Sequence, residues 1–455
     1  MKISLYITDT SGKRLSFDGS YEMEYNNVDI VESQNHEGDV EADLINIHAN
    51  VEYQTVGGIG GAFTDSCAGA LSALSDDKKE EFIKAYFDGE EGINYTFGRL
   101  SIGSCDFSTE DYTYVDENDL ELSSFDLSHD IDSVFPMIHS AMKYNDVTLF
   151  ASPWSPPAYM KTSLSRIGGH LDKDYYTLYA KYLRKYIKEC KKNGIDIFGI
   201  TLQNEPRHHQ IWESCLYTIE EEIELLGYVG KELEGMGVKI FCYDHCRERI
   251  MDRACAIFDS ENGKYCDGIA NHWYSGPHFG ELRAFNKLFP DKLSIASEGC
   301  CVARAGEDHK PLELGFAEDY AFDICGSFNN GLNYYCDWNL ALNENYGPHH
   351  NREGRKYVAY VPVCLNSEKN EVERRLAYYY IGHYSKFIKK GSKVIATSSY
   401  TDELMTVGFK NPDGSISVVI LNKTDKSFKF RLRCNGYLKS VVMTPHSIIT
   451  AVIMK

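Results

Sequence analysis

The stretch "IFGITLQNEP", Ile197 to Pro206, is an apolar run that ends in an amide pair, a glutamate and a proline. Gly194 precedes the run and Pro206 closes it, so the pattern predicts a short buried strand that leaves the core at its polar end. Glu205 would lie at this exit. A glutamate there is either a solvated loop residue or a group that does chemistry, and the rest of the chain has to decide between the two.

The same pattern recurs along the chain: a short apolar run, a polar loop, then an amphipathic stretch. The eight runs are "GGIGGAFTD", "YTFGRLSIGS", "VTLFASPWS", "IFGITLQNEP", "VKIFCYDH", "DGIANHWYS", "LSIASEGC" and "LNYYCDWNL". Strands that alternate with helices in this way predict an α/β fold, a (β/α)8 TIM barrel. On that fold, functional groups gather at the carboxyl ends of the strands. Glu205 would lie at the end of the fourth strand, and Glu298, in "IASEGC", at the end of the seventh.

Helix signals separate these runs. Thr218 and Glu221 have the spacing of a capping box at the start of an amphipathic stretch, and Gly235 and Gly237 follow its end. Ser75, followed by two aspartates, is typical of the residue that caps a helix at its N-terminus. The stretches between the runs therefore predict the helices that a (β/α)8 barrel requires.

The two chain ends have a different pattern. Residues 1–50 and 391–455 contain short strand-like runs and turns, such as "NPDGSISVVILN". Neither piece carries enough apolar surface to fold well alone. We therefore predict that both ends pair into one side β-sandwich domain, and that residues 51–390 form the barrel.

The overall composition restricts the partners. Of the 455 residues, 43% are hydrophobic and 25% charged, as is typical of a folded protein. The length exceeds what one core usually supports, so we expect one large domain and a smaller one. The net charge is −20 and the chain contains no basic run, which argues against nucleic acid and anionic membranes as partners. The sequence also contains no apolar run long enough to span a bilayer, so we expect no membrane insertion.

The start of the chain, "MKISLYITDTSGKRLSFDG", alternates like a strand and lacks the unbroken apolar core of a signal peptide. Without an export signal, the 14 cysteines are expected to stay reduced. We therefore predict a cytoplasmic protein. The sequence leaves the oligomeric state open.

The carboxylates of Glu205 and Glu298 suggest chemistry on an acetal, because strands four and seven face each other across a barrel mouth. Cleavage of a glycosidic bond needs a proton for the leaving oxygen and stabilisation of a cationic carbon. A carboxylic acid and an ionised carboxylate supply these. The alternative interpretation is that each glutamate lies on the barrel rim in a salt bridge.

The neighbouring residues favour the first interpretation. Asn204 could hydrogen-bond a sugar hydroxyl next to the reacting carbon. Arg99 and Asp106 flank the end of the second strand, where an arginine would keep a nearby nucleophile ionised and an aspartate would accept from sugar hydroxyls.

Aromatic residues lie at several other predicted strand ends. Trp154, Trp273, Tyr274 and Trp338 follow the third, sixth and eighth runs. Sugar rings stack on such faces, so these residues predict a carbohydrate site.

The string "FCYDHC" places Cys242, Asp244, His245 and Cys246 close together, and a zinc site is one interpretation. Successive side chains of a strand point to opposite faces, so these groups are not expected to converge. We predict no metal and no other cofactor.

Taken together, "GGAFTDS", "GRLSIGSCDFSTEDYTY", "ASPWSPPAYMKT", "LQNEP", "ANHWY", "ASEGC", "DWNLAL" and "IGHYSKFI" resemble the motifs of glycoside hydrolase family 30. The resemblance runs from about residue 57 to 390, with the motifs in the family's order. It is strongest to the branch with glucosylceramidase and bacterial β-glucosidases, β-xylosidases and β-1,6-glucanases. The C-terminal strands are similar to the side β-sandwich of that family.

This resemblance implies retaining double displacement, with Glu205 as the general acid/base and Glu298 as the nucleophile. It implies that Arg99 lies beside Glu298. It also implies that Asn204 and Tyr274 position the sugar and the nucleophile. The residues implied to bind the terminal glucose hydroxyls are Asp106, Trp154 and Trp338.

The expected function is exo-acting hydrolysis of β-linked glucosides, with short soluble glycosides as substrates. The sequence leaves open an endo-β-1,6-glucanase or a β-xylosidase that uses the same two glutamates. A non-catalytic sugar-binding barrel would be expected to lack one of the carboxylates, and both are present.

Overall fold

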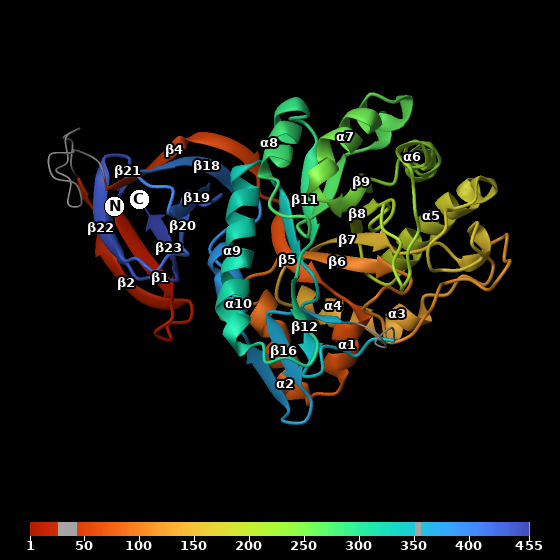
Figure 1. Cartoon of the computed structure of the whole chain (residues 1–455), viewed down its shortest axis with the longest axis horizontal. Coiled ribbons are helices and arrows are strands. Elements are labelled where there is room, and N and C mark those ends of the chain that lie inside the picture. The colour runs from red at the N-terminus through yellow and green to blue at the C-terminus, as the bar shows by residue number, and fades with distance from the viewer. Residues whose placement is uncertain (26–42, 351–355, 455) are drawn as a thin grey trace.

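The computed structural model describes residues 1–25, 43–350 and 356–454. Within these residues, eight parallel strands close into a barrel in the order β10-β11-β13-β5-β6-β7-β8-β9 (Figure 1). The barrel strands are β5 (Gly58–Ala62), β6 (Phe97–Ile102), β7 (Thr148–Pro153), β8 (Ile197–Thr201), β9 (Lys239–Cys246), β10 (Gly268–His272), β11 (Leu293–Glu298) and β13 (Tyr334–Asp337). Each of the eight apolar runs supplies one strand, so the predicted barrel is confirmed.

Helices surround the barrel: α1 (Asp65–Ser72), α2 (Asp76–Phe87), α3 (Ser128–Asp132), α4 (Val134–Met142), α5 (Tyr176–Lys192), α6 (Ile219–Leu233), α7 (Ile250–Phe258), α8 (Phe279–Leu288), α9 (Glu313–Asn329) and α10 (Leu376–Ser385). Short 3-10 turns also occur: η1 (Ala158–Met160), η2 (Lys173–Tyr175), η3 (Arg247–Arg249), η4 (Glu261–Tyr265) and η5 (Lys310–Leu312). Among the described residues, no helix has both the length and the apolar character that a membrane span requires.

The predicted helix ends form, with one difference. The Thr218 hydroxyl accepts from the backbone N–H of Glu221 at 3.2 Å, and the Glu221 carboxylate accepts from that of Thr218 at 2.8 Å, which completes the capping box of α6. Gly235, just after α6, has φ +79°, which a glycine adopts without strain. Ser75 is the N-cap residue of α2, but its hydroxyl bonds to Asn370 and does not accept from a backbone N–H of the helix.

Strands from both chain ends share one sheet beside the barrel. Its order among the described residues is β2-β1-β23-β20-β19-β18-β4-β21-β22-β3. The bounds are β1 (Lys2–Thr8), β2 (Ser16–Glu22), β3 (Glu24–Tyr25), β4 (Leu44–Thr55), β18 (Lys393–Ser399), β19 (Leu404–Lys410), β20 (Ile416–Asn422), β21 (Phe428–Cys434), β22 (Tyr437–Met443) and β23 (Ser447–Met454). Side chains from strands far apart in this order, including Ile3, Ile45, Val418 and Phe430, meet in one core. The predicted side β-sandwich built from both ends is therefore confirmed.

Helices α9 and α10 lie between the sheet and the barrel (Figure 1). On α10, the buried His383 contacts the hydroxyl of Thr8 on β1 at 2.9 Å and that of Thr450 on β23 at 2.8 Å. Because burial disfavours the charged imidazole, it lowers the pKa of His383 to about 3. A neutral histidine thus joins α10 to both chain ends.

In the part of the chain that the structure describes, two small sheets accompany the barrel. Strand β12 (Cys301–Arg304), just after the seventh barrel strand, pairs antiparallel with β15 (Tyr357–Tyr360). The second small sheet comprises β14 (Leu342–Asn343), β16 (Val363–Asn366) and β17 (Glu371–Arg374). Strands β12 and β15 matter for function, because both contribute residues to the cavity described below.

Candidate active site

The two predicted glutamates meet at the carboxyl end of the barrel. Glu298 is the last residue of β11, and Glu205 lies in the loop after β8 with a positive φ of 47°. The Glu205 backbone N–H donates to the carbonyl of Asp244 at 2.9 Å, which helps to hold this unusual conformation. Carboxylate oxygens of the two glutamates lie within 4.8 Å of each other. Retaining glycosidases have carboxyl groups about 5–5.5 Å apart and inverting ones about 6.5–9.5 Å, so this spacing fits retention.

Strong donors hold Glu298 on both oxygens. Arg99 Nη1 donates to Glu298 Oε2 at 2.6 Å, and the Tyr274 hydroxyl donates to Oε1 at 2.8 Å. Arg99 Nη2 donates to Asn204 Oδ1 and to Asp244 Oδ2, each at 2.9 Å. Arg99 lies inside β6 and is fully buried, so it reaches the site from within the barrel instead of from the strand end. The bonds at Glu298 stabilise its ionised form.

Asp244 lies beneath these residues, and the sequence analysis did not assign it to the site. The pairing of β9 with β10 shifts register here, and Asp244 has a φ of 41°, so a β-bulge re-aims its side chain into the barrel. Its carboxylate accepts bonds of 2.6–3.0 Å from Ser152, Thr201, His272 and Ser297 in addition to Arg99. Burial raises its pKa, but the charges of Arg99 and His272 outweigh burial and hold the pKa well below the usual range.

His272, the last residue of β10, is the second functional residue that the sequence analysis missed. Its Nδ1 lies 3.3 Å from Glu205 Oε1, and its Nε2 lies 3.0 Å from Asp244 Oδ1 and 4.0 Å from Glu298 Oε2. Burial lowers the pKa of an imidazole, but these three carboxylates raise that of His272 to about 9. The ring is therefore an imidazolium at neutral pH, directly beside both glutamates.

The titration of the two glutamates is linked to this histidine. Burial raises the pKa of Glu205, but hydrogen bonds with His208 and His272 lower it to well below the usual range. Burial and the Glu205 charge raise the pKa of Glu298, against the opposing effect of His272 and Arg99. Glu205, His272 and Glu298 thus titrate as one group, whose most basic member is His272.

The same three residues form the potential metal-ligand cluster found among the described residues. The donor chemistry does not fit a cation. His272 is charged and directs its ring nitrogens at carboxylates, so it has no lone pair to offer, and Arg99 already occupies Glu298. In "FCYDHC", Asp244 is held by the contacts above and Cys242 lies in the hydrophobic core, so these side chains do not form a zinc site.

A cavity of about 490 Å³, called the central cavity below, opens above the two glutamates. The predicted residues that line it are Asp106, Trp154, Asn204, Glu205, Tyr274, Glu298 and Trp338. The Trp154 and Trp338 rings stack on each other with centroids 5.2 Å apart, and they are 1% and 3% exposed. They therefore form a closed wall, which the Arg99 guanidinium supports from 4.7 Å and 5.4 Å.

The aromatic prediction differs from the structure at Trp273. Trp273 does not line the central cavity; its indole N–H donates to the Cys300 carbonyl at 3.1 Å, and its ring borders a neighbouring cavity. Trp212, in the loop after β8, lines the central cavity instead. That loop also contributes His208 and Gln210, and Gln210 Nε2 donates to Glu205 Oε2 at 3.3 Å.

Comparison with known proteins agrees with this geometry. Residues 56–388 match the family model of the glycosyl hydrolase family 30 TIM-barrel domain. Residues 391–451 match the model of the glycosyl hydrolase family 30 beta sandwich domain. Putative glucosylceramidase 3 of Caenorhabditis elegans is 33% identical over 432 residues, which cover 90% of this chain and 81% of that protein. The crystal structure of SrfJ from Salmonella typhimurium has a TM-score of 0.92 at 30% identity and covers 100% of both chains. A solved endo-β1,6-glucanase has a TM-score of 0.87 at 26% identity, again over 100% of both chains.

Proposed function

The chain belongs to glycoside hydrolase family 30 and is a glycoside hydrolase, and from this premise we propose that it is an exo-acting retaining β-glucosidase for short soluble glycosides. The observation that carries the proposal is the pair Glu205 and Glu298, with oxygens within 4.8 Å and with Arg99 and Tyr274 bonded to Glu298. This arrangement supports a nucleophile and an acid/base on opposite sides of one anomeric carbon.

In the first step, the Glu298 carboxylate attacks the anomeric carbon while Glu205 gives a proton to the leaving oxygen. The bond to the aglycone breaks and a covalent glycosyl-enzyme forms. His272 Nδ1, 3.3 Å from Glu205 Oε1, holds the proton that Glu205 passes on. In the second step, Glu205 removes a proton from water and returns it to His272 Nδ1, while the water oxygen attacks the anomeric carbon and releases Glu298.

The sugar-binding residues are assigned by the same logic. Arg99 holds the Asn204 carbonyl oxygen, so the amide nitrogen is the group that donates to a sugar hydroxyl. Asp106 accepts from hydroxyls at the cavity wall. The stacked Trp154 and Trp338 close the wall, which favours a terminal sugar over the middle of a chain.

A second candidate is an endo-β-1,6-glucanase with the same catalytic pair. It is favoured by the similarity of the whole chain to the solved endo-β1,6-glucanase. The two candidates differ in their products from a β-1,6-linked glucan: an exo-acting enzyme releases glucose from the first turnover, whereas an endo-acting one first releases oligosaccharides.

The test is hydrolysis of an aryl β-D-glucoside by the wild type and by Glu298→Ala. We expect turnover by the wild type and a loss of at least about 10⁴-fold in kcat in the variant, because the nucleophile is gone. A folded wild type that leaves the aryl glucoside intact contradicts the proposal, and β-xylosides and β-1,6-linked chains are then assayed as the next substrates.

A further inference from the structure

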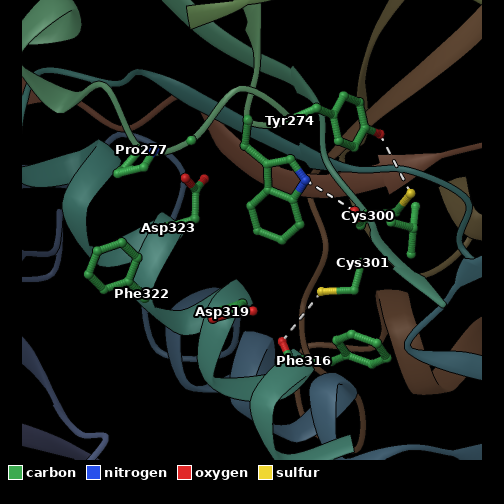
Figure 2. Close-up of a pocket in the computed structure, with 11 residues that line it drawn as sticks. Tyr274, Pro277, Cys300, Cys301, Phe316, Asp319, Phe322 and Asp323 are labelled. Atoms are coloured by element: carbon green, nitrogen blue, oxygen red, sulfur yellow. Dashed lines mark hydrogen bonds between the residues drawn. The ribbon is translucent and has the colours of Figure 1, made fainter. Parts of the chain in front are cut away.

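The two glutamates of the proposed mechanism are held by different parts of the fold. Glu298 accepts from Arg99, which lies inside β6, and from Tyr274, just after β10. The Tyr274 hydroxyl also lies 3.5 Å from the Cys300 sulfur, to which it points in Figure 2. The barrel therefore fixes the partners of Glu298, whereas one oxygen of Glu205 faces residues of its own loop.

His208 and Gln210 face the Oε2 oxygen of Glu205 from the solvent side. His208 Nδ1 lies 3.5 Å from Glu205 Oε2, and the His208 side chain is 58% exposed. Gln210 Nε2 lies 3.3 Å from the same oxygen and 2.7 Å from His208 Nδ1. His272, which is fully buried, faces the other oxygen, Oε1, at 3.3 Å. Glu205 thus lies between a histidine inside the barrel and a histidine in contact with water.

Backbone contacts hold the loop that carries His208. The His208 N–H donates to the Glu205 carbonyl at 2.9 Å, which closes a turn between the two residues. The Gln210 N–H donates to the Ser214 hydroxyl at 3.3 Å. His208 is therefore kept at Glu205 although its side chain is largely exposed.

Few charges act on His208 in the part of the chain that the structure describes. Glu205 raises the pKa of His208, whereas burial and the charge of Arg207 lower it. Arg207 is itself bonded to Glu248 at 2.9 Å. The His245 ring of β9 lies 6.2 Å from that of His208, between centroids. Burial lowers the pKa of His245 to about 4, so this ring is neutral at pH 7 and the Glu205 carboxylate is the main partner of His208.

The contacts of Glu205 Oε2 depend on the charge of His208. When His208 is neutral, Gln210 Nε2 donates one hydrogen to His208 Nδ1 and the other to Glu205 Oε2. When His208 is charged, its Nδ1–H points at Oε2 and the Gln210 amide turns its oxygen to the ring. Only the second state places a positive charge beside Oε2, and that charge favours the ionised carboxylate.

We propose that His208 is a positioning residue for Glu205, and that its charged ring keeps Glu205 ionised for the second step of the reaction, in which Glu205 is the base. This role rests on the function proposed above. It adds a solvent-exposed histidine to the acid/base unit, and it gives the loop after β8 a part in setting the pH range of activity.

The test measures the second step directly. The glycosyl-enzyme is trapped with 2-deoxy-2-fluoro-β-D-glucosyl fluoride, and the return of activity is followed against pH after the excess reagent is removed. Glu298 is esterified in the trapped enzyme and cannot titrate, so the loss of rate toward acid reports protonation of Glu205 beside His208, His272 and His245. We call this part of the profile the acid limb.

Two variants separate the charge of His208 from its shape. His208→Asn keeps a neutral donor near the position of Nδ1, and its acid limb should move up by about one pH unit, because the cation that favours the ionised carboxylate is lost. His208→Lys keeps a cation, and its acid limb should stay close to that of the wild type. The matched control is His209→Asn: the ring of this neighbouring histidine lies against Gly168, and the acid limb should not move.

Three results would contradict this role. Equal acid limbs in the wild type and His208→Asn overturn the role of His208 but leave the proposed function intact. Equal upward shifts in His208→Asn and His208→Lys also overturn it, because the ring would then act through its shape and not its charge. A folded wild type that forms no glycosyl-enzyme overturns both proposals.

Discussion

Two buried histidines of this protein have pKa values that are shifted in opposite directions, although burial lowers the pKa of both. His272, at the end of β10, and His383, on α10, both have fully buried side chains. The pKa of His272 is raised to about 9, whereas that of His383 is lowered to about 3. His272 faces three carboxylates, but His383 contacts threonine hydroxyls. The partners, and not the depth of burial, decide which ring is charged.

This difference separates the two parts of the fold. Burial removes solvation and disfavours any charged ring, unless opposite charges replace the lost water. The barrel centre supplies such charges and keeps an imidazolium beside the glutamates. The junction with the side sheet supplies none, so its histidine is a neutral hydrogen-bonding residue.

The largest expected effect comes from Glu205→Gln, which removes one of the carboxylates that face His272 while keeping the shape of the side chain. We expect kcat/KM, which reports the glycosylation step, to fall by about 10³–10⁴-fold for aryl β-glucosides with poor leaving groups, because they need the proton. For dinitrophenyl glucoside, kcat/KM should fall less than about tenfold, since its leaving group needs no proton. Equal losses for both substrates would contradict the acid role. The values of kcat/KM for the two substrates provide the measurement.

Asp244→Asn tests the deepest carboxylate. The variant leaves Arg99 and His272 with a neutral partner, and we expect the free energy of unfolding to fall by about 4 kcal/mol, as when one member of a buried ion pair is lost. Urea denaturation gives the value. The control is Asp319→Asn on α9, whose pair with Lys423 is exposed and should contribute less than about 1 kcal/mol. A loss at Asp244 no greater than at Asp319 would refute the role given to Asp244.

The architecture was accessible from sequence because it rests on local patterns. Each barrel strand is a short apolar run closed by turn residues, and the α6 capping box is a four-residue signal. Glu205 and Glu298 were predictable because they follow such runs directly. The pairing of the two chain ends was predictable because neither end has enough apolar surface to fold well alone.

Asp244 and His272 were missed because register shifts between neighbouring strands place them. A bulge overrides the strand alternation on which the analysis of "FCYDHC" depended, and a single sequence carries no signal for it. Trp273 was also misplaced: it lines only the neighbouring cavity, whereas the next residue, Tyr274, reaches the central cavity as well. The sequence signal that was available for Asp244 was a carboxylate near the end of an apolar run, the same signal that pointed to the two glutamates.

The pH dependence of stability tests the charge on His272. Its folded pKa of about 9 lies above the unfolded value of about 6.5, so its stabilisation is complete below pH 6.5 and is lost as pH rises through 9. The shift corresponds to about 3 kcal/mol of unfolding free energy over that window. Denaturation of Glu298→Gln, which lacks the charge that raises this pKa most, should show a shallower decline. Parallel curves for the two proteins would contradict the assignment.

The smallest effect is expected at the other histidine. The Thr450 hydroxyl donates to the His383 carbonyl at 3.0 Å, so the His383 Nδ1–H donates to Thr450 and Nε2 accepts from Thr8. An amide can make the same two bonds, and His383→Gln should cost only about 1 kcal/mol at pH 7. Because the folded pKa is about 3 and the unfolded one about 6.5, the wild type loses stability as pH falls through this range. The glutamine side chain cannot be protonated, so the unfolding free energy of the variant should fall less steeply below pH 6.5. If the unfolding free energies of the two proteins fall equally steeply there, His383 is not a neutral ring in the folded protein.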